Sequence, residues 1–380
     1  MGRLAEFPAY ARLPLDPAGA AGSTLSLRDG RELLDLYGGH CVNSLGAGDA
    51  GLGAALREQW DELSFATNLL PLEQRESFHA ALEAGLPAGE WSVFCANSGA
   101  EANENALKIA LAATGRGRVV CFEGAFHGRT AAAAAVSDMR SAAFPTDPFE
   151  VLRLPWGATA GIDDAVGAVI LEPIQSLAGV VDPPAGWLEA LRDACDRTGA
   201  LLVFDEVQTG SGRLGAPWAA QHFGVTPDLF TTAKGVGGGF PLGLSFATAA
   251  VTAACPSGLL GSTFGGGPLA LRAATEVARR VNDPAFLAGV RAASAALQRA
   301  AGRGPVVAVR GAGLLLGLVV EDGLPAKALR DALLAQGVLT GTCNDPQVLR
   351  LCPPLTLTAA QAESFLAALD AAAASLPARS

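Results

Sequence analysis

Short apolar runs alternate with helical patterns through the middle of the chain. The apolar runs cover residues 91–96, 118–122, 167–173, 200–205 and 228–233. Helical patterns lie between several of them, from Gly99 to about Ala113 and from Gly186 to Arg197. Runs of Val, Leu, Ile and Phe separated by helices are typical of a parallel sheet that is covered on both faces. The pattern therefore predicts an α/β fold with a mostly parallel sheet.

The pattern changes after Pro268. Helices are expected at 269–281, 285–301, 326–336 and 358–374, with strand-like runs beside 311–313 and at 348–351. This mixture predicts a smaller α+β domain. The first forty residues hold short strands and turns, so we expect them to pack on this C-terminal part. The expected division is an N-terminal segment (1–42), a large domain (43–265) and a small domain (266–380).

Composition and charge narrow the class of protein. Of the 380 residues, 50% are hydrophobic and 17% are charged, which is typical of a globular chain. No apolar run reaches the roughly 18 residues of a transmembrane helix, and the start lacks a secretory signal. The net charge of −10 argues against a nucleic-acid partner. We therefore expect a cytoplasmic protein without a membrane or nucleic-acid partner.

Cysteine and histidine spacing gives no sign of a metal. The seven cysteines are scattered without a C-x-x-C pair, and no two of the four histidines are spaced to share a helix face. We expect reduced thiols and no metal site built by the protein.

Lysine chemistry has few candidates, because the chain has only three lysines, at positions 108, 234 and 327. Lys327 stands four residues before Asp331 on a predicted helix and Lys108 lies on another, which are ordinary surface positions. Lys234 instead follows an apolar strand and precedes the glycine-rich run 235–239. This placement favours covalent catalysis by Lys234. The glycine run matches neither common nucleotide-binding pattern.

Two further features accompany Lys234 at strand ends. Asp205 ends a buried strand, where ligands bind in open α/β sheets, although such an acid can also be a helix cap or a loop residue. Ser98 with Glu101 predicts a capping box at a helix start. That helix end is also suited to an anion, and Gly99 lets a phosphate approach the backbone. A phosphate seat, an acid and a buried lysine are what pyridoxal 5′-phosphate requires.

At this point the motifs resemble those of the class III aminotransferases, most closely the acetylornithine aminotransferase branch, over about residues 20–375. The matching stretches are NSGAEANENALKIA (97–110), FHGRT (126–130), EPIQ (172–175), LLVFDEVQTGSGRLG (201–215), TPDLFTTAKGVGGGFPLG (226–243), GSTFGGGPLA (261–270) and LRLCPPLTLT (349–358). The resemblance implies fold type I of the pyridoxal-phosphate-dependent transferases. This fold has a seven-stranded, mostly parallel sheet with helices on both faces, and a smaller α+β domain.

The resemblance also implies how the cofactor ring is held. Lys234 would form the Schiff base with the cofactor and later transfer the proton. Asp205 would pair with the pyridinium nitrogen, and Gln208 would bind the phenolic oxygen. Val207 and Phe126 would lie against opposite faces of the ring.

The phosphate would bind at the helix start formed by Ser98, Gly99 and Ala100, with backbone N–H groups of the two latter residues as donors. Thr263 would reach the phosphate of the neighbouring subunit. The resemblance thus implies a homodimer with active sites at its interface.

Three residues are implied to bind the small-molecule amino-acid and oxo-acid substrates. Arg129 would bind the α-carboxylate of an acetylornithine-like donor, and Ser262 is a further candidate contact. Arg350 would hold the α-carboxylate of glutamate or 2-oxoglutarate by a bidentate pair, with a structural ion pair as the alternative. His127 is interpreted as a packing or loop residue without a role.

Three departures from the family pattern concern the substrate side. Leu177 stands where the family has a glutamate that neutralises the active-site arginine when an ω-amine enters. Residues 46–50 lack both histidines of the family's GHxHP, and 265–268 read GGGP instead of GGNP. Leu177 therefore predicts one of two kinds of substrate. The substrate either offers a carboxylate to Arg350 in both half-reactions or binds without contacting Arg350.

The expected reaction is a ping-pong transfer of an amino group from an N-acetylornithine-like or related amino acid to 2-oxoglutarate. Leu177 leaves open another class III aminotransferase with a different donor, either an ω-amine or an α-amino acid. An intramolecular aminomutase is a second alternative. A non-enzymatic binding module is the third, but it predicts damaged cofactor residues, whereas Asp205, Gln208, Lys234 and Thr263 are all present.

Overall fold

The computed structural model describes residues 7–9, 11–138 and 148–376. Its central feature is a seven-stranded sheet with the strand order β4-β10-β9-β8-β7-β5-β6. The strands are β4 (Trp91–Ala96), β5 (Arg118–Phe122), β6 (Glu150–Leu154), β7 (Val166–Leu171), β8 (Leu201–Asp205), β9 (Leu229–Thr232) and β10 (Gly243–Thr248). Only β10 runs antiparallel to its neighbours within this sheet, so the sheet is mostly parallel, as expected.

Alternate residues of each strand pack in hydrophobic layers on opposite faces of the sheet, because successive side chains of a strand point to opposite faces. In β5, Val119 and Cys121 pack with Leu107 of α4 (Gly99–Thr114). Val120 and Phe122 join the other layer, which includes α6 (Trp187–Thr198) and α9 (Pro268–Val281). The sheet is therefore covered by helices on both faces.

Glycines end the two helices that follow β4 and β7 along the chain. Gly115 caps α4 with a left-handed φ of 65°, and Gly199 caps α6 with a φ of 71°. Glycine adopts this conformation without the strain that a side chain would add. The predicted end of the second helix just before Gly199 is confirmed.

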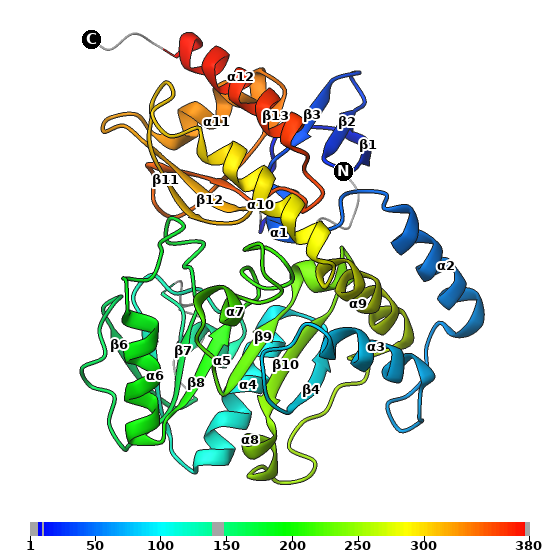
Figure 1. Cartoon of the computed structure of the whole chain (residues 1–380), viewed down its shortest axis with the longest axis vertical. Helices are drawn as coiled ribbons and strands as arrows, with labels where there is room; N and C mark the ends of the chain where they lie inside the picture. The colour runs from blue at the N-terminus through cyan, green and yellow to red at the C-terminus, as the bar shows by residue number, and fades with distance from the viewer. Residues whose placement is uncertain (1–6, 10, 139–147, 377–380) are drawn as a thin grey trace.

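A second body is built from the C-terminal part. Its antiparallel sheet has the order β11-β12-β15-β14. The strands are β11 (Val306–Ala312), β12 (Leu315–Val320), β14 (Gly341–Thr342) and β15 (Val348–Leu351), and the helices are α10 (Pro284–Gln298), α11 (Ala326–Ala335) and α12 (Ala359–Ser375). All of these elements except β14 contribute to one hydrophobic cluster. In Figure 1 this body occupies the upper part of the view and the seven-stranded sheet the lower part.

The start of the chain lies beside this second body (Figure 1). The strands β1 (Pro17–Ala21), β2 (Thr24–Leu27) and β3 (Glu32–Asp35) form a sheet that β13 (Val338–Leu339) completes. Because β3 and β13 pair in parallel, residues at opposite ends of the sequence share one sheet. Together, the two bodies agree with the expected fold class of a mostly parallel α/β sheet plus a smaller α+β part.

The remaining helical elements lie between these units or between the strands of the large sheet. They are α1 (Gly38–Cys41), α2 (Ala50–Leu63), α3 (Glu73–Glu83), α5 (Ala131–Ala135), α7 (Ala219–Phe223), α8 (Ala249–Ala253) and the 3₁₀ turn Lys234–Gly237. Because the strands β4, β5, β7, β8 and β9 run in one direction, the segments that follow them meet at one edge of the sheet. The candidate site lies at that edge.

Candidate functional site

A cavity of about 450 Å³ lies at the carboxyl edge of the seven-stranded sheet. The predicted residues in its lining are Ser98, Gly99, Ala100, Phe126, Arg129, Asp205, Val207, Gln208 and Lys234. The structure thus brings together segments that follow β4, β5, β8 and β9. Ser262, Thr263 and Arg350 lie outside this lining and are described below.

Lys234 begins the 3₁₀ turn that follows β9, and its backbone has a φ of 47°. A residue with a side chain rarely adopts this left-handed conformation, and such strain is concentrated at functional sites. Burial lowers the pKa of Lys234, although Cys41 and Asp205 oppose the shift. Burial therefore favours the neutral amine, which is the nucleophilic form.

Asp205 ends β8, and only 3% of its surface is exposed. Its Oδ2 accepts hydrogen bonds from Asn103 Nδ2 at 2.8 Å and from His127 Nδ1 at 2.7 Å. Its Oδ1 accepts one from the Val207 backbone N–H at 3.0 Å. Oδ1 therefore keeps acceptor capacity for a cationic N–H that enters the cavity.

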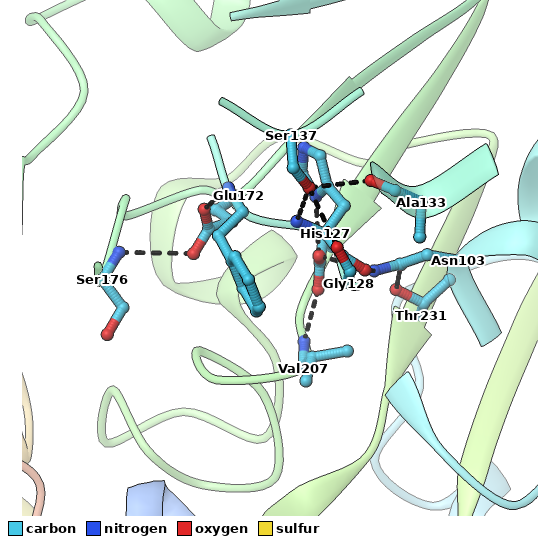
Figure 2. A network of polar contacts seen from close by, with 11 residues as sticks. Asn103, His127, Gly128, Ala133, Ser137, Glu172, Ser176, Val207 and Thr231 are labelled. Atoms are coloured by element: carbon cyan, nitrogen blue, oxygen red, sulfur yellow. Dashed lines mark hydrogen bonds and ion pairs between the residues drawn. The ribbon is translucent and has the colours of Figure 1, made fainter. Parts of the chain in front are cut away.

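Asn103 and His127 are themselves held in place (Figure 2). Thr231 donates to Asn103 Oδ1 at 2.6 Å, which directs the amide nitrogen to Asp205. The His127 backbone N–H donates to Ser137 Oγ at 2.7 Å. The interpretation of His127 as a residue without a role did not foresee its contact with Asp205, and Asn103 was missed. The only sequence signal was their position inside the two matching motifs.

The start of α4 forms another wall of the cavity. Ser98 Oγ accepts from the Glu101 N–H at 3.2 Å, so the helix cap is present. The predicted capping box is not complete, because the Glu101 carboxylate accepts from the Asn97 N–H at 3.0 Å instead of from the Ser98 N–H. A Cβ on Gly99 would lie 3.0 Å from Val207, and one on Gly243 would lie 2.2 Å from the Ser98 carbonyl oxygen. Glycine at both positions lets this helix end sit close to the strand ends.

Phe126 and Glu172 line the cavity near Asp205. The Phe126 N–H donates to Glu172 Oε1 at 2.9 Å, and the Ser176 N–H donates to Oε2 at 3.3 Å (Figure 2). Burial raises the pKa of Glu172 to about 7, with His127 opposing and Asp205 adding to the rise. The Arg129 guanidinium lies 5.3 Å from the centre of the Phe126 ring.

Arg350 lies on β15 and is 1% exposed. Its Nη1 donates to Ser176 Oγ at 2.9 Å and to Gln208 Oε1 at 3.4 Å. Its guanidinium also lies 5.7 Å from the Tyr37 ring centre. Within the described ranges no acid lies at ion-pair distance from Arg350, and its Nε has no hydrogen-bond partner. The alternative prediction, that Arg350 forms a structural ion pair, is therefore wrong within the described residues.

Leu177 follows Ser176 and is half-buried. Its carbonyl oxygen accepts from the Asn344 N–H at 2.7 Å, which ties this loop to the C-terminal body. A leucine side chain supplies no charge for Arg350.

Ser262 and Thr263 line a neighbouring cavity together with Phe65 and Asn68. Asn68 Nδ2 donates to the Ser262 carbonyl oxygen at 2.7 Å. Ser262 Oγ accepts from Asn97 Nδ2 at 3.5 Å, and Asn97 also lines the lysine cavity. Thr263 itself is exposed to solvent.

The described part of the chain holds no cluster of three or more His, Cys, Asp or Glu side chains suited to a metal ion. None of the helices in these ranges is long and apolar enough to cross a membrane.

The chain is similar to known proteins over almost its full length. The family model described as "Aminotransferase class-III" matches residues 8–373. The acetylornithine aminotransferase of Mycolicibacterium smegmatis is 42% identical over 373 residues, covering 95% of this chain and 94% of the relative. That of Methanosarcina acetivorans is 38% identical, covering 96% and 93%.

Solved structures agree. The N-acetylornithine aminotransferase of Stenotrophomonas maltophilia superposes with a TM-score of 0.82 at 31% identity, covering 97% of both chains. The ornithine aminotransferase of Toxoplasma gondii gives a TM-score of 0.88 at 26% identity, covering 96% and 91%. That structure has partial occupancy of PLP at its active site.

Proposed function

The chain belongs to the class III aminotransferases, and we propose that its cavity holds pyridoxal 5′-phosphate on Lys234 for transfer of an amino group from an amino acid to 2-oxoglutarate. One observation carries the proposal: Lys234, the Asp205 carboxylate and the start of α4 line the same cavity. They match the three parts of the cofactor, its aldehyde, ring nitrogen and phosphate. When bound, the cofactor supplies an electron sink for the bond that breaks at the donor carbon.

The side chains around the ring have separate tasks. Asp205 keeps the ring nitrogen protonated, using the acceptor capacity that remains on Oδ1. Gln208 donates to the phenolic oxygen, while Val207 and Phe126 flank the ring. Burial lowers the pKa of Lys234 and so favours its neutral amine, which would move the proton from the donor carbon once Lys234 is free of the cofactor.

The phosphate is assigned to Ser98, Gly99 and Ala100, where the first turn of α4 offers backbone N–H groups. We assign Thr263 to the phosphate of a partner subunit, which makes the enzyme a homodimer. Exposed apolar residues around Thr263 support this assignment, because apolar patches of this kind mark protein interfaces. They are Phe65, Leu69 and Phe264.

Arg350 and Arg129 are the proposed carboxylate ligands. Arg350 is a buried cation whose Nε is unpaired in the described structure, so a carboxylate of the oxo-acid can complete its hydrogen bonds. Arg129 binds the α-carboxylate of an N-acetylornithine-like donor, with Ser262 as a further contact. Both substrates are small molecules, and the proposed location is cytoplasmic.

The proposed domains are those expected, residues 1–42, 43–265 and 266–380. The separate hydrophobic clusters of the two bodies support a boundary near α9, which contributes Leu271 to one cluster and Val277 to the other.

An alternative donor is supported by Leu177, because no acid faces Arg350 within the described residues. The donor then either presents a carboxylate to Arg350 or binds without contacting Arg350. Kinetics of the wild type and Leu177→Glu on N-acetylornithine, glutamate and an ω-amine without a carboxylate test this. An unchanged donor preference in Leu177→Glu would refute it.

The aminotransferase proposal itself is tested with the cofactor-loaded protein and a panel of amines. Each productive donor converts the absorbance of the lysine-linked cofactor to that of pyridoxamine phosphate, and 2-oxoglutarate reverses the change. If no amine causes conversion, the proposal fails. Turnover that needs no oxo-acid would favour an aminomutase.

A further inference from the structure

Ser176 is a fully buried serine at the point where three distant segments meet. It follows β7, whereas Gln208 follows β8 and Arg350 lies on β15. Its Oγ donates to Gln208 Oε1 at 2.9 Å and accepts from Arg350 Nη1 at 2.9 Å. One hydroxyl group therefore uses its donor and an acceptor to join the two residues.

The Oε1 atom of Gln208 receives three donors. Besides Ser176, these are Arg350 Nη1 at 3.4 Å and Cys41 Sγ at 3.4 Å. The Ser176 contact is the shortest of the three. Because all three groups donate, the amide oxygen must face them, and the amide nitrogen is left for an acceptor in the cavity that Gln208 lines.

The hydroxyl also brings no negative charge to Arg350. Ser176 and the Gln208 amide carry no charge, and within the described residues no carboxylate lies at ion-pair distance from the guanidinium. A buried guanidinium without a carboxylate partner retains a strong preference for one. A fixed neutral partner holds the side chain in place and does not compete with that carboxylate.

We propose that Ser176 is a positioning residue that holds Arg350 ready for a substrate carboxylate and at the same time fixes the amide of Gln208 toward the cofactor. The inference rests on the proposed function. It predicts that loss of one hydroxyl group weakens carboxylate binding and disturbs the cofactor ring together, although Ser176 itself contacts neither.

The variants are Ser176→Ala, Ser176→Thr and, as a matched control, Ser245→Ala. Ser245 is also buried and donates one hydrogen bond, to the Ala102 carbonyl oxygen, but it lies on β10 outside the cavity lining. Calorimetry with glutarate, a dicarboxylate that cannot react, measures carboxylate affinity in the cofactor-loaded protein. Absorbance of the loaded protein between about pH 6 and pH 10 follows the proton that the phenolic oxygen shares with the lysine-linked nitrogen.

Ser176→Ala should raise the dissociation constant of glutarate about tenfold, the effect of one hydrogen bond to a charged group. It should also raise the Michaelis constant for the oxo-acid acceptor more than it lowers kcat, and shift the pH at which the cofactor absorbance changes. Ser176→Thr keeps the hydroxyl and should restore both values toward the wild type. Ser245→Ala should change neither.

Equal glutarate affinity and equal spectra in Ser176→Ala and Ser245→Ala would overturn the inference. If Ser176→Ala does not fold, Ser176→Cys replaces it in the comparison. Its thiol is a weaker donor, so its glutarate affinity and its absorbance should lie between those of the wild type and those expected for Ser176→Ala. Wild-type values in Ser176→Cys would overturn the inference. The proposed function fails separately, when the wild type itself neither binds the cofactor on Lys234 nor converts with any amine.

Discussion

His127 Nδ1 lies 2.7 Å from Asp205 Oδ2, and both side chains are buried. With Asn103 on the same oxygen, this contact fixes the plane of the carboxylate and leaves Oδ1 toward the cavity. We therefore propose that His127 acts on the cofactor through Asp205.

We predict that His127→Phe, which keeps a ring but loses the hydrogen bond, lowers kcat roughly 10- to 100-fold, as expected for a hydrogen bond to a charged group. Half-reaction kinetics with a good donor measure the effect. Asp205→Asn should be more damaging, because it removes the charge that keeps the ring nitrogen protonated. A His127→Phe enzyme with wild-type kinetics would show that the contact is merely structural.

The sequence was sufficient to predict those elements that are indicated by neighbouring residues in the chain. The buried strand ending at Asp205, the strand before Lys234 and the capped helix after Ser98 are all present in the structure. Each depends on a continuous apolar run or on a cap within four residues, which a single sequence displays directly.

What the sequence did not reveal depends on contacts between distant residues. His127 meets Asp205 across 78 positions, and Ser176 meets Arg350 across 174. Nothing beside either residue in the sequence signals its partner. The strands β6 and β10 were not among the predicted strands, and the antiparallel direction of β10 is set by its neighbours in the sheet.

Lys234 provides the second prediction. Because burial lowers its pKa, capture of pyridoxal 5′-phosphate should proceed with a pH midpoint below 10.5, the ordinary value for lysine. Stopped-flow absorbance of the cofactor-free protein mixed with cofactor measures this midpoint.

Lys234→Ala should abolish the absorbance of the linked cofactor and all turnover. Lys108→Ala, at an exposed position on α4, should leave both unchanged and serves as the control. A linked cofactor in the Lys234→Ala protein would contradict the assignment.

The third prediction separates helix capping from phosphate binding. Ser98 caps α4 at the cavity, and Thr358 caps α12 in the C-terminal body with the same geometry, accepting from Gln361. Replacing either by alanine should cost about 1 kcal/mol in the free energy of unfolding of the cofactor-free protein. Urea titrations measure this value.

Only Ser98→Ala should also weaken cofactor binding, because the N–H groups at the start of its helix are the proposed phosphate ligands. Equilibrium dialysis gives the dissociation constant of pyridoxal 5′-phosphate for each variant. An equal loss of cofactor affinity in Thr358→Ala would mean that the effect comes from general stability.

The fourth prediction concerns His40, which lies in the left-handed turn α1 with a φ of 65°. Its Nδ1 is 3.5 Å from Arg350 Nη2. Partial burial lowers the pKa of His40 to about 4, with further lowering by Arg350, Lys234 and Arg129. In the unfolded chain His40 is protonated as the pH falls through its ordinary pKa of 6.5, whereas in the folded chain it is protonated only near pH 4. The neutral ring therefore stabilises the fold above 6.5, and this stabilisation is lost as the pH falls from 6.5 toward 4.

We predict that the free energy of unfolding of the cofactor-free protein falls more steeply over this pH window in the wild type than in His40→Asn. Urea titrations at pH 7, 6, 5 and 4 measure both curves, over roughly the span of the two pKa values. Tyr37→Phe is the control. It removes the hydroxyl that lies 2.9 Å from His40 Nε2 but keeps the titrating His40 ring. Its curve should therefore stay as steep as that of the wild type. Parallel curves for the wild type and His40→Asn would show that neither burial nor the charge of Arg350 lowers the pKa of His40, and would weaken the picture of Arg350 as a buried cation awaiting a carboxylate.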